Sequence, residues 1–409
     1  MDALQYLLGL EQFGIKFGLE NIGAIVERLG HPERAFTSVH IAGTNGKGSV
    51  TAMVDAALRA AGHRSARYTS PHLVDLSERF VIGGRPVDQR DLIAAVAAVR
   101  TVVDSLCDAG VLAVQPTFFE VTTAVAFELF RRAQVEIAVL EVGLGGRLDA
   151  TNVVAPPHLV ATAITSIAFD HQLYLGSTLR EIAIEKAGIV KAGVPLVVGP
   201  LDPEPMEAIE RAARERGAPV VRATAADAAG RSIGLRGSHQ AANAAIAVRL
   251  LEIVDQRGIR VPDEAIAEGL ARPEWPGRLD TRTLADGRTL LVDAAHNPAG
   301  AAALASYLEE EGTRRPLVFA AMRDKDVAGM FAALLPAVSR LIVTRASNSR
   351  SAEPEALAER ARAIAPGLPV SIEPLISDAL AEAWRHSRSI VVAGSIFLLG
   401  DVLKLVDGT

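Results

Sequence analysis

Short, continuously apolar segments alternate with amphipathic segments along most of this chain. Apolar runs at Val135–Val142, Leu159–Ile167 and Pro195–Gly199 are predicted as strands, and the last two precede helical stretches near Thr178–Lys186 and Pro205–Arg216. Strands that are apolar along their whole length are typical of a mostly parallel sheet with helices on both faces. The alternation therefore predicts an α/β fold.

The same alternation starts again near Leu290 and continues toward the C-terminus. Between the two parts, prolines and glycines interrupt the periodicity from Arg272 to Arg288, which is typical of a linker. We therefore expect two domains. Residues 1–280 would form the larger domain, with a P-loop-type sheet, and residues 287–409 a smaller α/β, Rossmann-like C-terminal domain.

Composition excludes several classes of protein. The 409 residues are 49% hydrophobic and 22% charged with a net charge of −6, which suits a globular protein without a broad basic surface for nucleic acid. No apolar run approaches the roughly 20 residues of a membrane span. The N-terminal segment, with Asp2 and Glu11 around its apolar residues, is not predicted to be a signal peptide, and the single cysteine, Cys107, suits a reducing compartment. We expect a cytoplasmic protein with neither nucleic-acid nor membrane partners.

The most specific local pattern is HIAGTNGKGSV, residues 40–50. A predicted strand leads into a loop with three glycines, and a helix follows, so that backbone N–H groups and a helix N-terminus converge where a phosphate binds. Lys47 would add a positive charge. The spacing departs from the usual phosphate-loop motif, because Ile41 replaces its first glycine and Gly48 separates Lys47 from Ser49. A tight turn without a ligand is the alternative.

Two further polar clusters follow successive predicted strands. Glu141 begins the segment EVGLGGRLDATN, and Asp170 and His171 follow the next strand, before a helix that ends near Lys186. Ligands bind at the carboxyl ends of parallel strands, and a carboxylate there suits Mg²⁺. Taken singly, Glu141 is more often a cap or surface charge, His171 a structural histidine, and Lys186 a helix-end cation. Together they predict one site for a nucleotide, a metal and a reacting carboxylate.

Three more clusters lie beside the predicted domain border. Asn243 is on the first turns of a helix that starts at SHQAAN, Arg278 lies in WPGRLD, and Asp293 and His296 lie in VDAAHNPAG at a strand end. A helix cap, a linker arginine and a strand-end turn are the plain alternatives for these residues. Their shared location favours a ligand.

These motifs, in this order, resemble the folylpolyglutamate synthase and dihydrofolate synthase family of the Mur ligase superfamily. The resemblance rests on GTNGKGS, SPHL, EVGLGGRLDATN, ITSIAFDH, EKAGI, HQAAN, PGRLD and DAAHNP. It extends from GIKFGLENI near Gly14 to about Asp326, and more loosely to the end of the chain.

The resemblance implies roles for individual residues. ATP would be bound by Gly43, Thr44, Asn45, Gly46, Lys47, Gly48, Ser49, Asn243, Arg278, Asp293 and His296. Mg²⁺ would be bound by Ser49, Ser70, Glu141, His171 and Lys186, the last as a carbamate. The substrate-binding residues would be Ser70, Pro71, His72, Phe118, Phe119, Glu120, Arg147 and Asp149, with the pterin against the segments that contain Ser70 and Phe118. Catalytic roles would fall to Lys47, His171 and Lys186.

The implied reaction is the ATP-dependent addition of L-glutamate to a folate through an acyl phosphate, with dihydropteroate as a second candidate substrate. A ligase that adds an amino acid to a cell-wall precursor, and a nucleotide-dependent switch without ligase activity, are the alternatives. The sequence leaves open which pterin is accepted, how many glutamates are added, whether Lys186 is carbamylated and which group is the general base. A monomer is expected.

Overall fold

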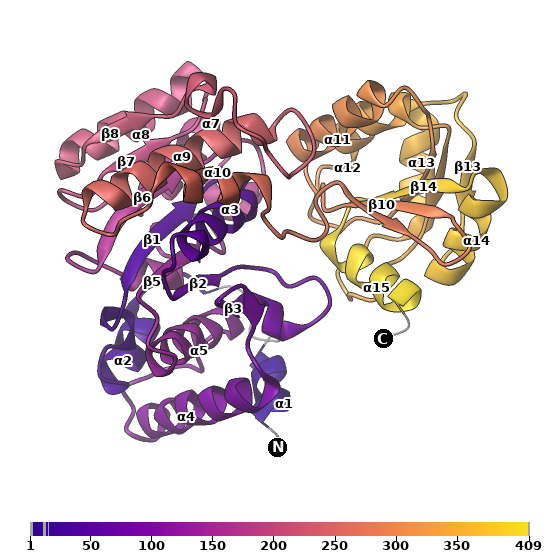
Figure 1. Ribbon diagram of the computed structural model, residues 1–409. Helices are drawn as coiled ribbons and strands as arrows, with labels where there is room; N and C mark the ends of the chain where they lie inside the picture. Colours follow the sequence, from indigo (N-terminus) through magenta and orange to yellow (C-terminus); the bar gives the residue numbers. More distant parts are fainter. Residues whose placement is uncertain (1–2, 11–13, 15, 408–409) are drawn as a thin grey trace. The chain divides into compact units, whose positions relative to one another are not determined.

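The computed structural model describes residues 3–10, 14 and 16–407, and it divides into two compact units (Figure 1). Unit 1 lies within 1–167, 178–234 and 241–274, and unit 2 comprises 168–177, 235–240 and the remainder from Trp275. The chain therefore passes between units at five places, the last of them inside the predicted linker. The domain limits 1–280 and 287–409 stay a prediction, and Asp2 and Glu11 lie outside the described residues.

The sheet of unit 1 has eight strands in the order β4-β3-β2-β5-β1-β6-β7-β8. The strands from β2 to β8 in this order are parallel, whereas β3 is antiparallel to β2 and to β4. The strands are β1 (Thr37–Ala42), β2 (Ser65–Tyr68), β3 (Phe80–Ile82), β4 (Arg85–Pro86), β5 (Ile137–Glu141), β6 (Leu159–Ile164), β7 (Leu196–Val198) and β8 (Val220–Arg222).

The helices of unit 1 pack on both faces of this sheet, because alternate residues of its buried strands face opposite sides. On one face, Ala138 and Leu140 of β5 share a core with α2, α4 and α5, and Ile164 of β6 shares a core with α7 and α8. On the other face, α3 packs on β1, β2 and β5, and α10 packs on α3. These helices are α1 (Ala3–Gly9), α2 (Glu20–Arg28), α3 (Lys47–Ala60), α4 (Gln89–Asp108), α5 (Phe118–Arg132), α7 (Leu179–Ala187), α8 (Pro203–Arg216), α9 (Gln240–Gln256) and α10 (Asp263–Ala271).

The sheet of unit 2 has six strands in the order β13-β12-β11-β14-β10-β9, all parallel except the edge strand β9. One face carries α11, α12 and α13, and α14 and α15 contact its central strands. The strands are β9 (Asp280–Thr283), β10 (Thr289–Asp293), β11 (Pro316–Phe319), β12 (Arg340–Val343), β13 (Val370–Ile372) and β14 (Ser389–Ala393). The helices are α6 (Gln172–Leu175), α11 (Pro298–Glu310), α12 (Val327–Leu334), α13 (Pro354–Ile364), α14 (Ile376–His386) and α15 (Ile396–Asp407).

The predicted fold class is confirmed: each unit is a mostly parallel sheet flanked by helices. In unit 1, β1 lies between β5 and β6, and the chain leaves it through α3 to reach β2 on the far side of β5. This reversal of strand order is where α/β sheets bind ligands, at the carboxyl ends of the strands. None of the helices in the described part of the chain combines the length and apolar composition of a membrane span.

Candidate active site

The loop between β1 and α3 is shaped by glycines. Gly43 and Gly46 have φ angles of +150° and +88°, in the region that side chains other than glycine rarely adopt. A Cβ atom on Gly43 would collide with Oγ1 of Thr165, and one on Gly46 would collide with Oδ1 of Asn243. Glycine is therefore required at both positions, and the collision distances show that Asn243 of α9 lies against this loop.

Lys47 begins α3 and folds back over its own loop. Its Nζ donates hydrogen bonds to the carbonyl oxygens of Gly43 at 3.1 Å and Thr44 at 3.2 Å, and lies 4.0 Å from Oε1 of Glu141. The N–H groups in the first turn of a helix have no carbonyl partner four residues earlier, so the start of α3 attracts anions. The structure thus places the ammonium group of Lys47 and the first-turn N–H groups of α3 beside the same loop.

Oxygen ligands gather at the same sheet edge. Glu141 ends β5, is only 4% exposed, and its Oε2 accepts a hydrogen bond at 3.4 Å from the N–H of Ser70, which follows β2. The hydroxyl of Ser49 is on the first turn of α3, and that residue is 3% exposed. One carboxylate with hydroxyl groups suits Mg²⁺, which usually takes one or two protein carboxylates together with phosphate oxygens. Within the described residues, no group of three His, Cys, Asp or Glu side chains forms a metal cluster.

Lys186 joins the loop from the last turn of α7. It is 4% exposed, and its Nζ donates to the carbonyl oxygen of Gly43 at 3.0 Å. Two lysines, Lys47 and Lys186, therefore share one backbone oxygen. Like charges this close to one oxygen repel each other, and the carboxylate of Glu141, 4.0 Å from Nζ of Lys47, offsets part of that repulsion.

The loop after β5 is held by a buried polar network. Asp149 accepts hydrogen bonds from the N–H of Leu144 at 2.9 Å, from the N–H of Thr151 at 3.0 Å and from the Thr151 hydroxyl. That hydroxyl in turn accepts from Nε2 of His40 on β1 at 2.8 Å. Burial raises the pKa of Asp149 and lowers the pKa of His40 to about 3, so the imidazole is neutral. In this structure Asp149 shapes its loop, and Arg147, predicted beside it, pairs with Glu185 of α7 at 2.9 Å.

The residues predicted to contact the pterin occupy two small groups in unit 1. The guanidinium of Arg79 lies 5.1 Å from the Phe118 ring centroid, and its Nε donates to Nδ1 of His72 at 2.9 Å. The rings of Phe119 and Tyr68 lie 5.9 Å apart. Aromatic faces with an arginine beside them suit a flat heterocycle.

Glu120, also predicted to contact substrate, is used by its own helix. Its Oε2 accepts hydrogen bonds from the N–H of Thr117 at 2.7 Å and from the Thr117 hydroxyl at 2.9 Å, and its N–H donates to that hydroxyl at 3.2 Å. This reciprocal pair is a capping box at the start of α5. The Thr-x-x-Glu spacing in the sequence carries that signal.

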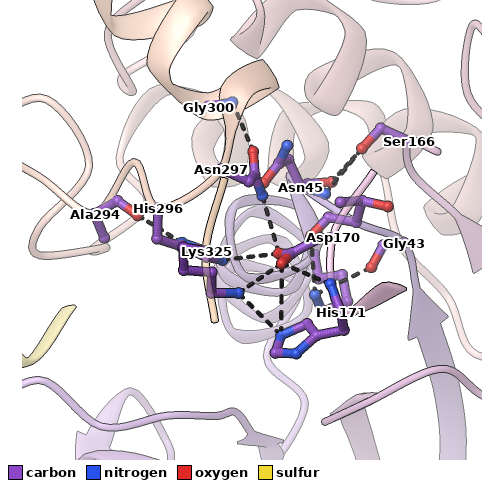
Figure 2. A network of polar contacts seen from close by, with 12 residues as sticks. Gly43, Asn45, Ser166, Asp170, His171, Ala294, His296, Asn297, Gly300 and Lys325 are labelled. Atoms are coloured by element: carbon purple, nitrogen blue, oxygen red, sulfur yellow. Dashed lines mark hydrogen bonds and ion pairs between the residues drawn. The ribbon is translucent and has the colours of Figure 1, made fainter. Parts of the chain in front are cut away.

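Asp170 and His171 belong to unit 2, where Asp170 is the centre of a network shown in Figure 2. Its carboxylate contacts Nζ of Lys325 at 2.5 Å, Nε2 of His296 at 3.3 Å and Nδ2 of Asn297 at 3.1 Å. Burial opposes ionisation, but the hydrogen bond from His296 and the charges of His296 and Lys325 lower the pKa of Asp170 overall. The predicted residue His296 therefore contacts Asp170, which lies in the segment after β6.

The other predicted residues of unit 2 lie near His171 or Asp293. Nε2 of His171 is 3.3 Å from Nζ of Lys325, and burial together with that charge lowers the pKa of His171 to about 4. Asp293 accepts from the N–H of Leu279 and of Ala295, each at 2.9 Å, and its pKa is raised by burial although Arg278 acts to lower it. A pocket lined by Asp170, His171, Asn297 and Lys325 opens in this unit.

Two comparisons relate the sequence of this chain to known proteins. Residues 277–396 match the family described as Mur ligase, glutamate ligase domain. The chain is 35% identical to dihydrofolate synthase/folylpolyglutamate synthase of Bacillus subtilis over 80% of its own length and 81% of that protein. The chain belongs to the folylpolyglutamate synthase/dihydrofolate synthase family.

Solved structures of this family agree with the fold. The structure of Mycobacterium tuberculosis folylpolyglutamate synthase complexed with ADP and AMPPCP has a TM-score of 0.88 and 34% identity, covering 99% of both chains. A bifunctional folylpolyglutamate synthase/dihydrofolate synthase with Mn, AMPPNP and L-glutamate bound has a TM-score of 0.85 and 30% identity, covering 100% of this chain and 98% of that one.

The motif ITSIAFDH includes Thr165 and Ser166, but the sequence predicted no role for these two residues or for Lys325. Thr165 and Ser166, directly after β6, bond to the phosphate loop, and Lys325 pairs with Asp170. Paired hydroxyl residues at a strand end were the available signal for the first two. Lys325 lies 155 positions from Asp170, and no sequence pattern links them.

Proposed function

We propose that this chain is an ATP-dependent ligase that joins the amine of L-glutamate to a folate carboxylate through an acyl phosphate. The observation that carries the proposal is the convergence of Lys47, Lys186 and Glu141 on the loop between β1 and α3. The family assignment supplies the reaction class, and the match to a glutamate ligase domain supports glutamate as the amine substrate.

The phosphate loop provides the positive charge that the first step needs. A carboxylate is a poor acylating agent, and its attack on the γ-phosphorus of ATP requires positioning and charge neutralisation rather than a protein nucleophile. Lys47 rests on two neutral carbonyl oxygens, which are weaker partners than phosphate oxygens. We expect its Nζ to turn to the β- and γ-phosphates when ATP binds.

The ligand set beside the loop fits a magnesium ion. Glu141 supplies a carboxylate, and Ser49 and Ser70 supply hydroxyl groups, all of them the hard oxygen ligands that Mg²⁺ prefers. A bound ion would neutralise phosphate charge. Metal binding by His171 is a separate prediction, because the structure gives its contacts within unit 2 only.

Lys186 is proposed to carry a carbamate. Carbamylation converts an ammonium into an anion but leaves one N–H, which would keep the hydrogen bond to the Gly43 carbonyl at 3.0 Å. In this reaction the neutral amine adds to dissolved carbon dioxide, and two protons are lost in all from the ammonium. Burial favours the neutral amine, and Lys186 is 4% exposed. The new carboxylate would then offer oxygen atoms to the metal and relieve the repulsion with Lys47.

The finer assignments are also proposals. Activity on dihydropteroate, the monomeric state and the cytoplasmic location follow from the resemblance and the composition. The two aromatic groups at Phe118 and Phe119 are proposed to face the pterin, since both lie at the start of α5.

A coupled assay of ADP release tests this function. We expect ADP to form only when ATP, Mg²⁺, L-glutamate and a pterin substrate are all present. In Lys47→Ala, turnover should fall by about 100-fold or more, because a charge that stabilises the transition state is lost. The control Lys404→Ala removes an exposed lysine of α15 and should retain full turnover. ADP release that ignores L-glutamate and pterin would indicate a nucleotide switch instead.

A further inference from the structure

Two hydroxyl side chains after β6 bond to the apex of the phosphate loop. The carbonyl oxygen of Asn45 accepts from Oγ1 of Thr165 at 2.6 Å and from Oγ of Ser166 at 3.0 Å. In the other direction, the N–H of Asn45 donates to Oγ of Ser166 at 2.9 Å and the N–H of Thr44 donates to the Ser166 carbonyl at 2.7 Å. Figure 2 shows the contact between Asn45 and Ser166.

These contacts define which way each peptide group of the loop points. In a planar trans peptide, the C=O and the following N–H point in opposite directions. The carbonyls of Gly43 and Thr44 face Lys47, and the N–H groups that follow them face Ser166. The next peptide is reversed, because the carbonyl of Asn45 faces Thr165 and Ser166, so the N–H of Gly46 points away from them.

The reversal changes what the loop presents on the side of Lys47. Two carbonyl oxygens, which repel phosphate, are followed by the N–H of Gly46 and then by the first-turn N–H groups of α3, which attract it. The φ angle of +88° at Gly46 then joins the reversed Asn45–Gly46 peptide to the first turn of α3. Both hydroxyls bond to the one carbonyl whose orientation decides where this change occurs.

We propose that Thr165 and Ser166 are positioning residues for the ATP phosphates, which act by holding the Asn45–Gly46 peptide in its reversed orientation. They touch the loop rather than the nucleotide. The inference rests on the proposed function in that the loop must bind ATP, and it adds a determinant outside the glycine-rich motif.

Three substitutions separate this role from general support of the fold. Thr165→Val keeps the side-chain shape and removes the hydroxyl, whereas Thr165→Ser keeps the hydroxyl. Ser166→Ala removes the second hydroxyl. The matched control is Thr162→Val. Thr162 is buried like Thr165, but it lies within β6, and its hydroxyl donates to the Pro195 carbonyl at 3.3 Å rather than to the loop.

Calorimetric titration with MgATP, together with thermal unfolding without ligand, tests the proposal. We expect Thr165→Val and Ser166→Ala each to bind MgATP about tenfold more weakly, the effect of one lost hydrogen bond. Thr165→Ser should stay within about twofold of the wild type, and Thr162→Val should bind normally even if its unfolding temperature falls.

The contrary results are distinct. MgATP affinity unchanged in the double variant Thr165→Val/Ser166→Ala would overturn the positioning role while leaving the proposed function intact. Equal losses in Thr162→Val and Thr165→Val would also overturn it, because the effect would then be structural. A wild-type protein that does not bind MgATP would overturn both proposals.

Discussion

At the scale of single residues, the site concentrates charged side chains around one backbone loop. Lys47 and Lys186 donate to the same carbonyl oxygen, and Glu141 lies 4.0 Å from Nζ of Lys47. The two lysines thus bring positive charge to the loop that is expected to bind phosphate, with the Glu141 carboxylate beside one of them. A bound phosphate would add negative charge between them.

A carbamate on Lys186 predicts a specific pattern of chemical rescue. Lys186→Ala should lose turnover by about 100-fold or more, since both the metal ligand and the hydrogen bond to Gly43 disappear. Short carboxylic acids added to the assay should restore part of that turnover, because they replace the missing carboxylate. Rescue by alkylamines instead of carboxylic acids would show that the ammonium is the active form.

The buried imidazole of His40 predicts a dependence of stability on pH. Its pKa is lowered by burial from 6.5 to about 3, so below pH 6.5 the unfolded chain takes up a proton that the folded chain does not. Stability is therefore lost as pH falls from about 6.5 toward 3, by about 1.4 kcal/mol per pH unit from this residue.

The variant His40→Gln isolates this effect, because its amide can still donate to Thr151 but does not titrate. Urea unfolding at pH 7 and pH 5 should show the wild type losing about 2 kcal/mol more than the variant. Parallel losses in the two proteins would show that His40 is not the titrating group.

At the scale of elements, the end of α7 and the loop after β5 pack without room for side chains. A Cβ atom on Gly188 would collide with Arg147, and one on Gly146 would lie 2.8 Å from the Lys186 carbonyl oxygen. Asn152 closes the same contact by donating to the carbonyls of Arg147 at 3.0 Å and Gly188 at 3.2 Å. This packing determines where Lys186 lies relative to the phosphate loop.

Gly188→Ala should therefore reduce turnover by about tenfold or more and destabilise the protein by about 1 to 3 kcal/mol, because the added methyl group displaces the end of α7. The control Gly23→Ala lies in α2 with open space around it and should be neutral or stabilising by up to about 1 kcal/mol. Steady-state turnover and urea unfolding measure both effects. Normal turnover in Gly188→Ala would contradict the positioning of Lys186 by this contact.

The sequence predicted the elements whose burial is continuous and missed those whose burial depends on distant partners. Strands β5, β6 and β7 lie within the predicted apolar segments, and β1 includes the strand predicted before the glycine loop. Strand β2 reads SARY and was not predicted, yet all its residues are buried. Its Ser65 hydroxyl donates to Asp55 of α3 at 2.6 Å, and Arg67 lies 3.4 Å from the same carboxylate. A local hydrophobic pattern cannot predict that these buried polar side chains are paired with a residue of another element.

The site shows the same division. The glycine loop and Glu141 were predicted as site residues from the residue types at strand ends. The role of Lys186 was predicted from the resemblance. The hydrogen bonds of Thr165 and Ser166 depend on the adjacency of β1 and β6, which are separated by more than a hundred residues. Local sequence carries no information on that pairing.

At the scale of the whole molecule, the chain passes between the two units several times rather than through one linker. Residues 168–177 connect β6 to α7, both in unit 1, but belong to unit 2 by their contacts. The ion pair between Asp170 and Lys325, with side chains 8% and 9% exposed, is one of the contacts that this segment makes with the rest of unit 2.

Asp170→Asn should destabilise unit 2 by about 3 kcal/mol, because Lys325 would remain buried without a charged partner. Differential scanning calorimetry should show the loss as a lower unfolding temperature. Asp324→Asn, an exposed neighbour of Lys325, is the matched control and should change stability by less than about 0.5 kcal/mol. Equal effects of the two substitutions would argue that the ion pair contributes little.

Mass spectrometry of the products tests the ligase function most directly. The protein would be incubated with ATP, Mg²⁺ and L-glutamate, and with a reduced folate or dihydropteroate in turn. We predict a product heavier than the pterin by one or more glutamyl residues, formed together with ADP and absent when L-glutamate is omitted or Lys47 is replaced by Ala. ATP hydrolysis without any glutamylated product from either pterin would contradict the assignment.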